Sequence, residues 1–501
     1  MNQQHNTAKV VVIGAGLGGL SAAISLASEG FKVELVEKND KVGGKLNVLT
    51  QDGFTFDLGP SILTMPQIFE ALFRRVGKHM ADYVSIEKVD PHWRNFFEDG
   101  SVIDLCADPA RQRRELDQLG PKAYDEFSRF MAYSKRLGEE TEAGYFAHGL
   151  DSLWDLLKFY GPLRSLKFDV FRTMDQGVRR FISDPKLVDI LNYFIKYVGS
   201  SPYDAPALMN LMPYIQYQYG LWYVQGGMYG LAQALEKLAL ELGVRIHLNS
   251  EVETIVTDDD RASAVRIKGG ETLVADIVVS NMEVIPAMKT LLKASYDEIE
   301  SMKRFEPSCS GLVLHLGVDR LYPQLAHHNF FYSSQPRQHF DAVFKHHTLS
   351  DDPTLYLVAP CKTDPSQAPA GCEIIKVLPH IPHIDPDQPH SDADYRALRE
   401  RVLVKLERMG LTDLRQHIVT EDYWTPRDIE ARYYANQGSI YGVVADRNKN
   451  LGFKAPQRSS RFSNVYFVGG SVNPGGGMPM VVLSGQLVRD KILVDLAGWP
   501  R

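Results

Sequence analysis

Three glycines and one glutamate near the N-terminus have the spacing of a dinucleotide-binding loop. Gly14, Gly16 and Gly19 form a GxGxxG pattern, and Glu37 follows 18 residues after the last glycine. The first glycine permits a tight turn, the second lets the backbone approach a pyrophosphate, and the third allows close packing of a helix on a strand. Glu37 would accept a hydrogen bond from an adenosine ribose hydroxyl. A glycine turn without a ligand is the alternative interpretation.

The segments around these glycines predict a βαβ unit. Residues 10–13 are a short apolar β-branched run of the kind found in buried parallel strands. Residues 20–29 read as a helix stopped by Gly30, and residues 32–37 as the second strand. The N-terminus of such a helix faces the negative charge of a phosphate. The uncharged run 10–27 is long enough for a membrane span, but the four glycines in its middle favour a strand, a turn and a helix.

Three further glycine-rich segments occur in the chain. The first is Lys-Val-Gly-Gly-Lys-Leu-Asn at residues 41–47, and the second is Gly-Phe-Thr-Phe-Asp-Leu-Gly-Pro at residues 53–60. The second segment is expected to be a loop, in which Asp57 either caps local backbone amides or lies near a cofactor. The third, residues 466–480, predicts a strand, a loop lined by small residues, and a helix. Backbone amides of such a loop can meet a pyrophosphate, a ribityl chain or a ring edge.

Together these segments resemble the bacterial phytoene desaturase family, a carotenoid-oxidising branch of the FAD-dependent amine-oxidase-like proteins. Lys45 stands where the family usually has an arginine near the phosphates, and Ser471 stands where many related flavoproteins have an acid. Asn473-Pro-Gly-Gly-Gly-Met-Pro479 corresponds to the HPGxGxP pattern of the carotenoid branch. The resemblance implies FAD as the cofactor, held by Gly14, Gly16, Gly19, Glu37, Lys45, Gly59, Val252, Gly469, Gly470, Ser471, Pro474, Gly475 and Met478.

Within that family the similarity is sharpest with the 4,4'-diaponeurosporene oxygenases, in residues 56–66, 193–201, 220–224, 280–286 and 325–331. This resemblance implies oxidation of the terminal methyl group of 4,4'-diaponeurosporene, a thirty-carbon carotenoid, to the aldehyde 4,4'-diaponeurosporenal in a staphyloxanthin-type pathway. One alternative is a desaturase acting on dehydrosqualene or phytoene. Another is a non-catalytic, flavin-bound carotenoid carrier, although a carrier would have no need of a redox ring.

Composition restricts the class of protein further. The net charge of −7 over 501 residues argues against a nucleic-acid partner. The four cysteines form no CxxC pair and are too sparse for a disulfide framework or a structural zinc site. A reducing cytoplasm is therefore the expected compartment.

The expected fold class is α/β. It combines a Rossmann-like FAD-binding domain of amine-oxidase type, a substrate-binding α+β domain and a helical membrane-facing region. We assign FAD binding to residues 1–90, 220–285 and 456–501, the helical region to 91–219, and the substrate domain to 286–455. A helix is expected at residues 228–242. Strands are expected at 244–248, 252–256, 264–267 and 272–280, returning the chain to the nucleotide-binding sheet, and at 465–468 before a helix from Pro479.

A polyene dissolved in a bilayer must be reached from the membrane surface. Residues 153–167 combine aromatic, aliphatic and basic side chains in an amphipathic stretch, which Gly161 and Pro162 would divide. This pattern predicts a peripheral protein on the inner face of the cell membrane, where other carotenoid-pathway enzymes are plausible partners. A helix covering the protein's own core is the alternative.

No catalytic residue can be assigned from the sequence. Aromatic residues at 214, 217, 219, 222 and 223 either line a polyene channel or belong to the core. The other candidates are His327, His328, His380, His383, Lys196 and Asp204. Adjacent histidines on a strand would point to opposite faces, and no convincing metal-ligand spacing is present.

Overall fold

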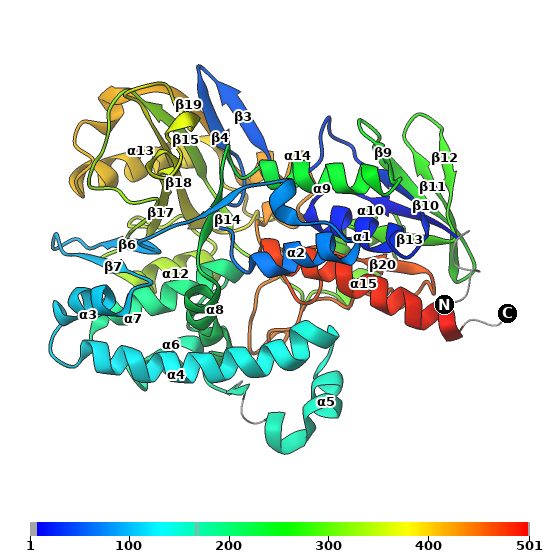
Figure 1. The fold of residues 1–501 in the computed structure, drawn as a ribbon, viewed down its shortest axis with the longest axis horizontal. Helices are drawn as coiled ribbons and strands as arrows, with labels where there is room; N and C mark the ends of the chain where they lie inside the picture. Colours follow the sequence, from blue (N-terminus) through cyan, green and yellow to red (C-terminus); the bar gives the residue numbers. More distant parts are fainter. Residues whose placement is uncertain (1–7, 166–167, 170, 499–501) are drawn as a thin grey trace.

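A five-stranded parallel sheet joins the first and last segments of the chain (Figure 1). The computed structural model describes residues 8–165, 168–169 and 171–498. The strand order is β20-β13-β1-β2-β9, and every neighbouring pair is parallel. The strands are β1 (Lys9–Ile13), β2 (Lys32–Val36), β9 (Arg245–His247), β13 (Ile277–Ser280) and β20 (Val465–Phe467). The predicted βαβ unit and C-terminal strand are thus confirmed.

Four helices pack around this sheet: α1 (Leu17–Ala27), α2 (Pro66–Arg75), α9 (Gly230–Glu241) and α15 (Met478–Gly498). In Figure 1, α15 runs beside α1 and α2, and both chain ends lie at the same side of the molecule. The Ser21 hydroxyl of α1 donates to the Val482 carbonyl of α15 at 2.6 Å. A Cβ at Gly485 would lie 2.5 Å from the backbone nitrogen of Ala22. Glycine at position 485 therefore allows the two helices their close approach.

Only part of residues 244–280 returns to the parallel sheet. Strands β10 (Val252–Asp258), β11 (Arg261–Ile267) and β12 (Thr272–Val274) form a separate antiparallel sheet. The predicted single strand at 272–280 was wrong, because it is two strands, β12 and β13, in different sheets. The alternating exposed and buried positions of β10 and β11 explain the difference. Such strands suit an antiparallel sheet with one solvated face, not the doubly covered parallel sheet.

A second, eight-stranded mixed sheet forms the domain at the upper left of Figure 1. Helix α13 (Asp392–Arg408) belongs to the same domain, and its buried residues join the core of this sheet. The sheet also includes an N-terminal hairpin, residues 93–105, that precedes the helical region. The domain boundaries given above stay a prediction. The strands are β6 (Trp93–Phe96), β7 (Val102–Leu105), β14 (Ser310–Gly311), β15 (Val313–Val318), β16 (His328–Phe331), β17 (Leu355–Val358), β18 (Glu373–Ile381) and β19 (Ile418–Trp424).

The expected loop at residues 53–60 is largely a strand. A hairpin forms from β3 (Val48–Gln51) and β4 (Phe54–Asp57). Phe54 and Phe56 are buried and stack with ring centroids 5.9 Å apart. Two aromatic residues spaced by two favour a strand with one packed face, and this pattern outweighs the turn-forming residues beside it. A shorter ladder pairs β5 (Ile86–Lys88) with β8 (Trp222–Val224).

The region between these sheets is helical, as predicted, and lies at the bottom of Figure 1. Gly161 has φ +71° within α5, so the predicted break there is confirmed. Leu166 and Lys167, at the end of the predicted amphipathic stretch, lie outside the described residues. Within the described part of the chain, no helix has both the length and the apolar character needed to cross a membrane. The helices are α3 (Pro109–Asp117), α4 (Ala123–Thr141), α5 (Leu153–Ser165), α6 (Met174–Arg179), α7 (Pro185–Asn192), α8 (Met212–Tyr219) and α12 (Pro336–Phe344).

The close contact of α1 with β1 gives a first prediction. A Cβ at Gly19 would lie 1.9 Å from the carbonyl oxygen of Gly14, so Gly19→Ala requires the backbone to move. Overpacking of this kind costs about 1–3 kcal/mol. We expect a thermal midpoint about 1–3 °C lower in calorimetry, because the unfolding entropy of a chain of this length is large. Gly498→Ala, with nothing within 4 Å of the new Cβ, is the control and should leave the midpoint unchanged. Equal midpoints for wild type and Gly19→Ala would contradict the packing described here.

Candidate active site

One cavity of about 1140 Å³ connects the glycine loops of the parallel sheet with the helical region. At one end it is lined by Gly14, Gly16 and Glu37, and at the other by residues of α5 such as Leu156 and Tyr160. Its walls have far more apolar than polar surface. The lining therefore suits two molecules: a ligand with a polar part at the glycine loops, and a long apolar molecule in the rest of the cavity.

The N-terminal glycine loop has the geometry that the GxGxxG spacing predicts. Gly14 has φ +91°, a conformation that strongly favours glycine. Gly16 caps α1 without any side-chain hydrogen bond, and it pairs with Gly43 of the second glycine segment. Gly19 lies outside the cavity, and its contact with Gly14 holds the helix against the strand. The free amides at the start of α1 consequently face the cavity with the positive end of the helix dipole.

Glu37 is 5% exposed at the carboxyl end of β2 and lines the cavity. One carboxylate oxygen accepts the Ala15 backbone amide at 2.8 Å, and the other accepts the backbone and side-chain amides of Asn39, each at 2.8 Å. These bonds fix the carboxylate beside the glycine loop. Carboxylate oxygens have further lone pairs, so Glu37 can also accept a hydroxyl from a ligand.

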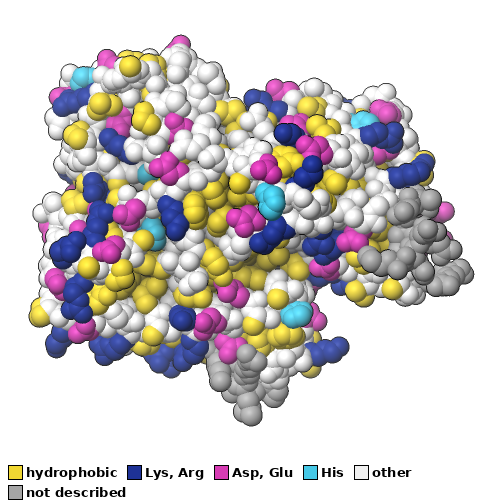
Figure 2. All heavy atoms as spheres, viewed as in Figure 1, with side chains coloured by type: hydrophobic (Ala, Val, Ile, Leu, Met, Phe, Trp, Pro, Cys, Tyr) yellow, Lys and Arg dark blue, Asp and Glu magenta, His cyan; other side chains and the backbone are white. Residues whose placement is uncertain are grey.

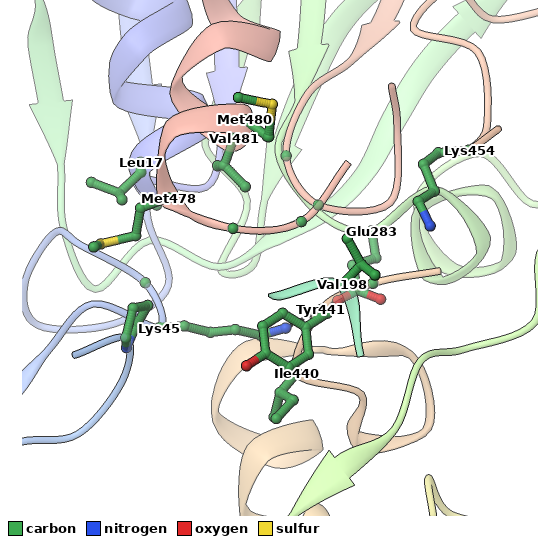
Figure 3. Close-up of a pocket in the computed structure, with 18 of the residues that line it drawn as sticks. Leu17, Lys45, Val198, Glu283, Ile440, Tyr441, Lys454, Met478, Met480 and Val481 are labelled. Atoms are coloured by element: carbon green, nitrogen blue, oxygen red, sulfur yellow. Dashed lines mark hydrogen bonds and ion pairs between the residues drawn. The ribbon is translucent and has the colours of Figure 1, made fainter. Parts of the chain in front are cut away.

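Lys45 lines the cavity from the second glycine segment, and Figure 3 shows it facing the same space as Met478 and Tyr441. Its ammonium group forms an ion pair with Glu283 at 3.2 Å and donates to the Ser439 carbonyl at 2.9 Å. Lys45 is therefore held by protein partners, and it brings one positive charge to the cavity wall.

The C-terminal glycine loop contributes some of its predicted residues to the cavity. Gly469, Gly470, Pro474 and Met478 line it. Ser471 does not, because its hydroxyl accepts the Val284 amide at 3.0 Å.

Gly475 is also absent from the cavity wall, and its Cα faces the side chain of Lys454. Gly59 and Val252, predicted from other segments, both line the cavity.

The wall residues that the sequence reasoning missed include Asn281, Tyr441 and Gly442. The Asn281 side chain lies between the two glycine loops, 2.7 Å from a Cβ built at Gly16 and 2.9 Å from one built at Gly469. It directly follows β13, at the carboxyl edge of a parallel sheet where ligands commonly bind, and this position was an available signal. The segment with Tyr441 and Gly442 gave no comparable signal.

A buried acid, Asp57, lies behind the cavity wall near Gly59, and a buried base, Lys376, forms part of that wall. Burial raises the pKa of Asp57 to about 6, and nearby Lys376 opposes this shift. Burial lowers the pKa of Lys376 to about 8. Asp57 accepts the amide of Met228, which is distant in sequence, at 2.8 Å, so of its two interpretations the cap of a local turn does not hold. Lys376 lines the cavity and donates to the Gly59 carbonyl and the Ser61 hydroxyl.

Of the other candidates from the sequence, Lys196 lines the cavity and the rest lie away from it. His327 and His328 are buried with ring centroids 4.4 Å apart, so the expectation of opposite faces was wrong: His327 precedes β16. No group of three metal-ligating side chains occurs among the residues that the structure describes. Outside the cavity wall lie His327, His328, His380, His383 and Asp204, together with the aromatic residues Tyr214, Tyr217, Tyr219, Trp222 and Tyr223, for which the core interpretation holds.

Comparison with known proteins decides the family. The chain matches the model of flavin containing amine oxidoreductases over residues 17–493. The chain belongs to this family. It is 78% identical to a 4,4'-diapolycopene oxygenase of a Methylomonas species, over 99% of this chain and 100% of that protein. It is 54% identical to the 4,4'-diaponeurosporene oxygenase of Staphylococcus haemolyticus, over 97% of each chain. Within the flavin-containing family it therefore groups with the thirty-carbon carotenoid oxygenases.

The fold agrees with this assignment. A solved structure of putrescine oxidase bound to putrescine has a TM-score of 0.66 with 16% sequence identity, over 97% of this chain and 99% of that chain. The α/β fold is that of the FAD-dependent amine oxidases, and the cofactor of this oxidoreductase is FAD. The cavity fits FAD. Gly16 and Gly44 lie so close together that a Cβ on Gly44 would be 3.0 Å from the Cα of Gly16. Because neither residue has a side chain, their backbones are uncovered at the cavity wall.

The position of Glu37 gives a second prediction. Glu37→Gln removes the charge that anchors the Ala15 amide and leaves a weaker acceptor for a ribose hydroxyl. A charged hydrogen bond contributes about 1.5–3 kcal/mol, so we expect FAD to bind at least tenfold more weakly in a flavin titration.

The matched control is Glu34→Gln. Glu34 lies on the same strand but pairs with His247 outside the cavity, so FAD affinity should not change. Equal weakening by both substitutions would contradict a direct role for Glu37.

Proposed function

We propose that this flavoprotein oxidises the terminal methyl group of an acyclic thirty-carbon carotenoid to an aldehyde, with molecular oxygen as the oxygen source. One observation carries the proposal: a single cavity joins the two glycine loops, which we call the glycine cradle, to a long apolar space that ends at α5. A rod-like hydrocarbon in that space would place one end at the cofactor and leave the other toward the helical region.

Each part of the cradle has a proposed role toward FAD. The amides at the start of α1 would meet the pyrophosphate, and Glu37 would accept a hydroxyl of the adenosine ribose. Lys45 would add a positive charge near the phosphates, and Val252 would lie against the adenine. The 469–478 loop would meet the ribityl chain and the ring edge. Gly19, Ser471 and Gly475 would act indirectly, by positioning α1 and this loop.

FAD, when bound, supplies the redox chemistry, and the protein's task is to place the reacting carbon and exclude water. The side chains that can do so are apolar and come from two sides of the cavity. Met209, Leu211, Met212 and Ile215 come from the helical region. Val358 and Leu378 come from the large sheet on the opposite side, so a conjugated chain between them would be shielded from solvent.

The names and identities of the relatives favour 4,4'-diapolycopene as the substrate. 4,4'-Diaponeurosporene is the second candidate, supported by the less similar staphylococcal relatives. A desaturase remains the alternative activity on the same fold.

An oxygen-18 experiment tests this proposal. Purified protein with FAD is incubated under labelled oxygen gas with liposomes containing either carotenoid. We expect an aldehyde carrying the label by mass spectrometry, with faster turnover of diapolycopene. Loss of hydrogen without oxygen incorporation would establish a desaturase. Absence of any product, with the carotenoid bound, would establish a carrier.

We further propose that the substrate enters from a membrane surface at α5. Trp154 is 81% exposed and Phe171 is 71% exposed, and Leu153 and Phe159 are also exposed. Leu153 and Phe171 line the cavity as well, so the exposed apolar surface continues into it. Figure 1 shows α5 at the lower edge of the molecule, and Figure 2 shows hydrophobic side chains gathered in the recess between the helices and the domains above. Apolar and aromatic residues grouped in this way suit the lipid interface.

We propose that this surface binds the cytoplasmic face of the membrane. All four cysteines are free thiols, which is typical of a reducing compartment.

Replacement of Trp154 tests the entry surface. Trp154→Ser should weaken binding to liposomes in a flotation assay by about thirtyfold, because burial of one large aromatic side chain contributes about 2 kcal/mol. Tyr296→Ser, at a 75% exposed position outside the cavity wall, should bind like the wild type. Liposome binding unchanged by Trp154→Ser would show that α5 does not face the lipid.

A further inference from the structure

Three lysines that line the cavity are buried: Lys196, Lys376 and Lys454. Lys376 donates to Gly59 and Ser61, and Lys454 donates to the Val443 carbonyl at 2.5 Å. Lys196 is 4% exposed, and its side-chain amine has neither a hydrogen bond nor an ion pair to any residue that the structure describes. A buried amine without a partner is costly, and it points to a ligand that supplies one.

The surroundings of Lys196 are aromatic. Its Nζ lies 4.0 Å from the ring centroid of Tyr356, 4.7 Å from that of Tyr197, 4.8 Å from that of Phe330 and 5.0 Å from that of Trp93. We call these four rings and Lys196 the aromatic cage. Ring faces attract a cation but accept no conventional hydrogen bond. The N–H groups of Lys196 therefore stay available in the cavity in either protonation state.

The two tyrosine hydroxyls of the cage are engaged elsewhere. Tyr356 pairs with the His328 ring nitrogen at 3.0 Å, and Tyr197 donates to the Gln216 side-chain oxygen at 2.7 Å. Gln216 is 1% exposed and also lines the cavity. Its Nε2 is buried without a hydrogen-bond partner. Lys196 thus brings unpaired N–H donors to an otherwise apolar part of the cavity, and Gln216 fixes the neighbouring Tyr197 through its side-chain oxygen.

The cage lies on the cofactor side of the apolar space. Tyr356 of β17 is the register partner of Leu378 in β18, and Lys376 of the same strand reaches Gly59. Val198, two residues after Lys196, lies beside Tyr441 in the close-up of Figure 3. A carotenoid end that reaches the cofactor would therefore pass the cage, whereas α5 lies at the other end of the cavity.

We propose that Lys196 forms a subsite for the carbonyl oxygen of the aldehyde product, with its Nζ as the hydrogen-bond donor and with Gln216 holding Tyr197 of the aromatic cage in place. The proposal rests on the proposed oxidation of a terminal methyl group. An all-hydrocarbon substrate offers this donor nothing, so it discriminates the oxygenated end from the unreacted one. Lys196 is thus a specificity-determining residue that contacts the product.

Ligand binding without turnover tests this subsite. Under anaerobic conditions, holoprotein with oxidised FAD is titrated with 4,4'-diaponeurosporenal and, separately, with the parent hydrocarbon 4,4'-diaponeurosporene, following quenching of protein fluorescence. Lys196→Met keeps the length of the side chain and removes its donors. We expect about tenfold weaker binding of the aldehyde and unchanged binding of the hydrocarbon. Gln216→Met should give a smaller loss of the same kind, and Lys196→Gln, which keeps a donor, should retain part of the affinity.

The absorption of the bound aldehyde provides a second readout. A hydrogen bond to the carbonyl shifts the polyene absorption to longer wavelength, so the shift should be present in the wild type and absent in Lys196→Met. Equal loss of affinity for aldehyde and hydrocarbon would show a merely structural role and overturn the proposal. Borohydride trapping of a covalent adduct at Lys196 would replace the hydrogen bond by an imine and also overturn it.

Failure of the subsite is distinguishable from failure of the proposed function. Aldehyde affinity unchanged in Lys196→Met, with labelled aldehyde still formed in the oxygen-18 assay, would overturn only the subsite. Selective aldehyde binding through Lys196 without any oxygenated product in that assay would overturn only the proposed activity.

Discussion

The packing of α15 on α1 is the contact on which the rest of the structure depends. These helices come from opposite ends of the chain, and a Cβ on Gly485 of α15 would clash with the backbone of Ala22 and the side chain of Ser21 in α1. On its other side, α1 lies close to β1, since Gly19 faces the Gly14 carbonyl. Two close contacts at glycines thus fix α1 between the sheet and α15. The loop before each helix is positioned as a consequence, because Gly16 precedes α1 and Gly477 precedes α15.

The cavity follows from this arrangement. With both glycine loops at the carboxyl edge of one parallel sheet, only a small polar side chain fits between them, and Asn281 occupies that place. The segment that follows β19 then closes the far side, where Gly442 packs so tightly on Gly470 that a Cβ would lie 2.5 Å from its carbonyl oxygen. Bare backbone surrounds the polar end of the cavity. Side chains from the helical region and from the large sheet surround the apolar end, and the two kinds of wall meet near Gly59 and Lys376.

Sequence reasoning succeeded where the determinants are local. The βαβ unit, the helix break at Gly161 and the C-terminal strand follow from short patterns that specify both structure and position. It failed where partners distant in sequence decide. The alternation in β10 and β11 was visible, but their separation from the parallel sheet depends on which faces are covered. For the candidate site, Gly14, Gly16 and Glu37 lie at the predicted cavity, whereas Ser471 bonds an amide almost 190 residues away in sequence. Tyr441 and Gly442 became wall residues only through tertiary packing, and no local motif marks them.

The distribution of polar groups along the cavity has a consequence for a symmetric, rod-like ligand. A hydrocarbon chain has no polar group by which a protein could orient it, so shape and aromatic contact must hold the substrate. Oxidation changes this balance, because a carbonyl left without a hydrogen-bond partner in an apolar cavity costs about 1–3 kcal/mol. Donors near the reacting end remove that cost and hold the oxidised end at the cofactor side. In the proposed subsite the same donors would slow release of the product toward α5, where the wall is apolar. Retention of the first oxidised end would then oppose inversion of the rod, and oxidation of the second end would require full release and re-entry from the opposite direction.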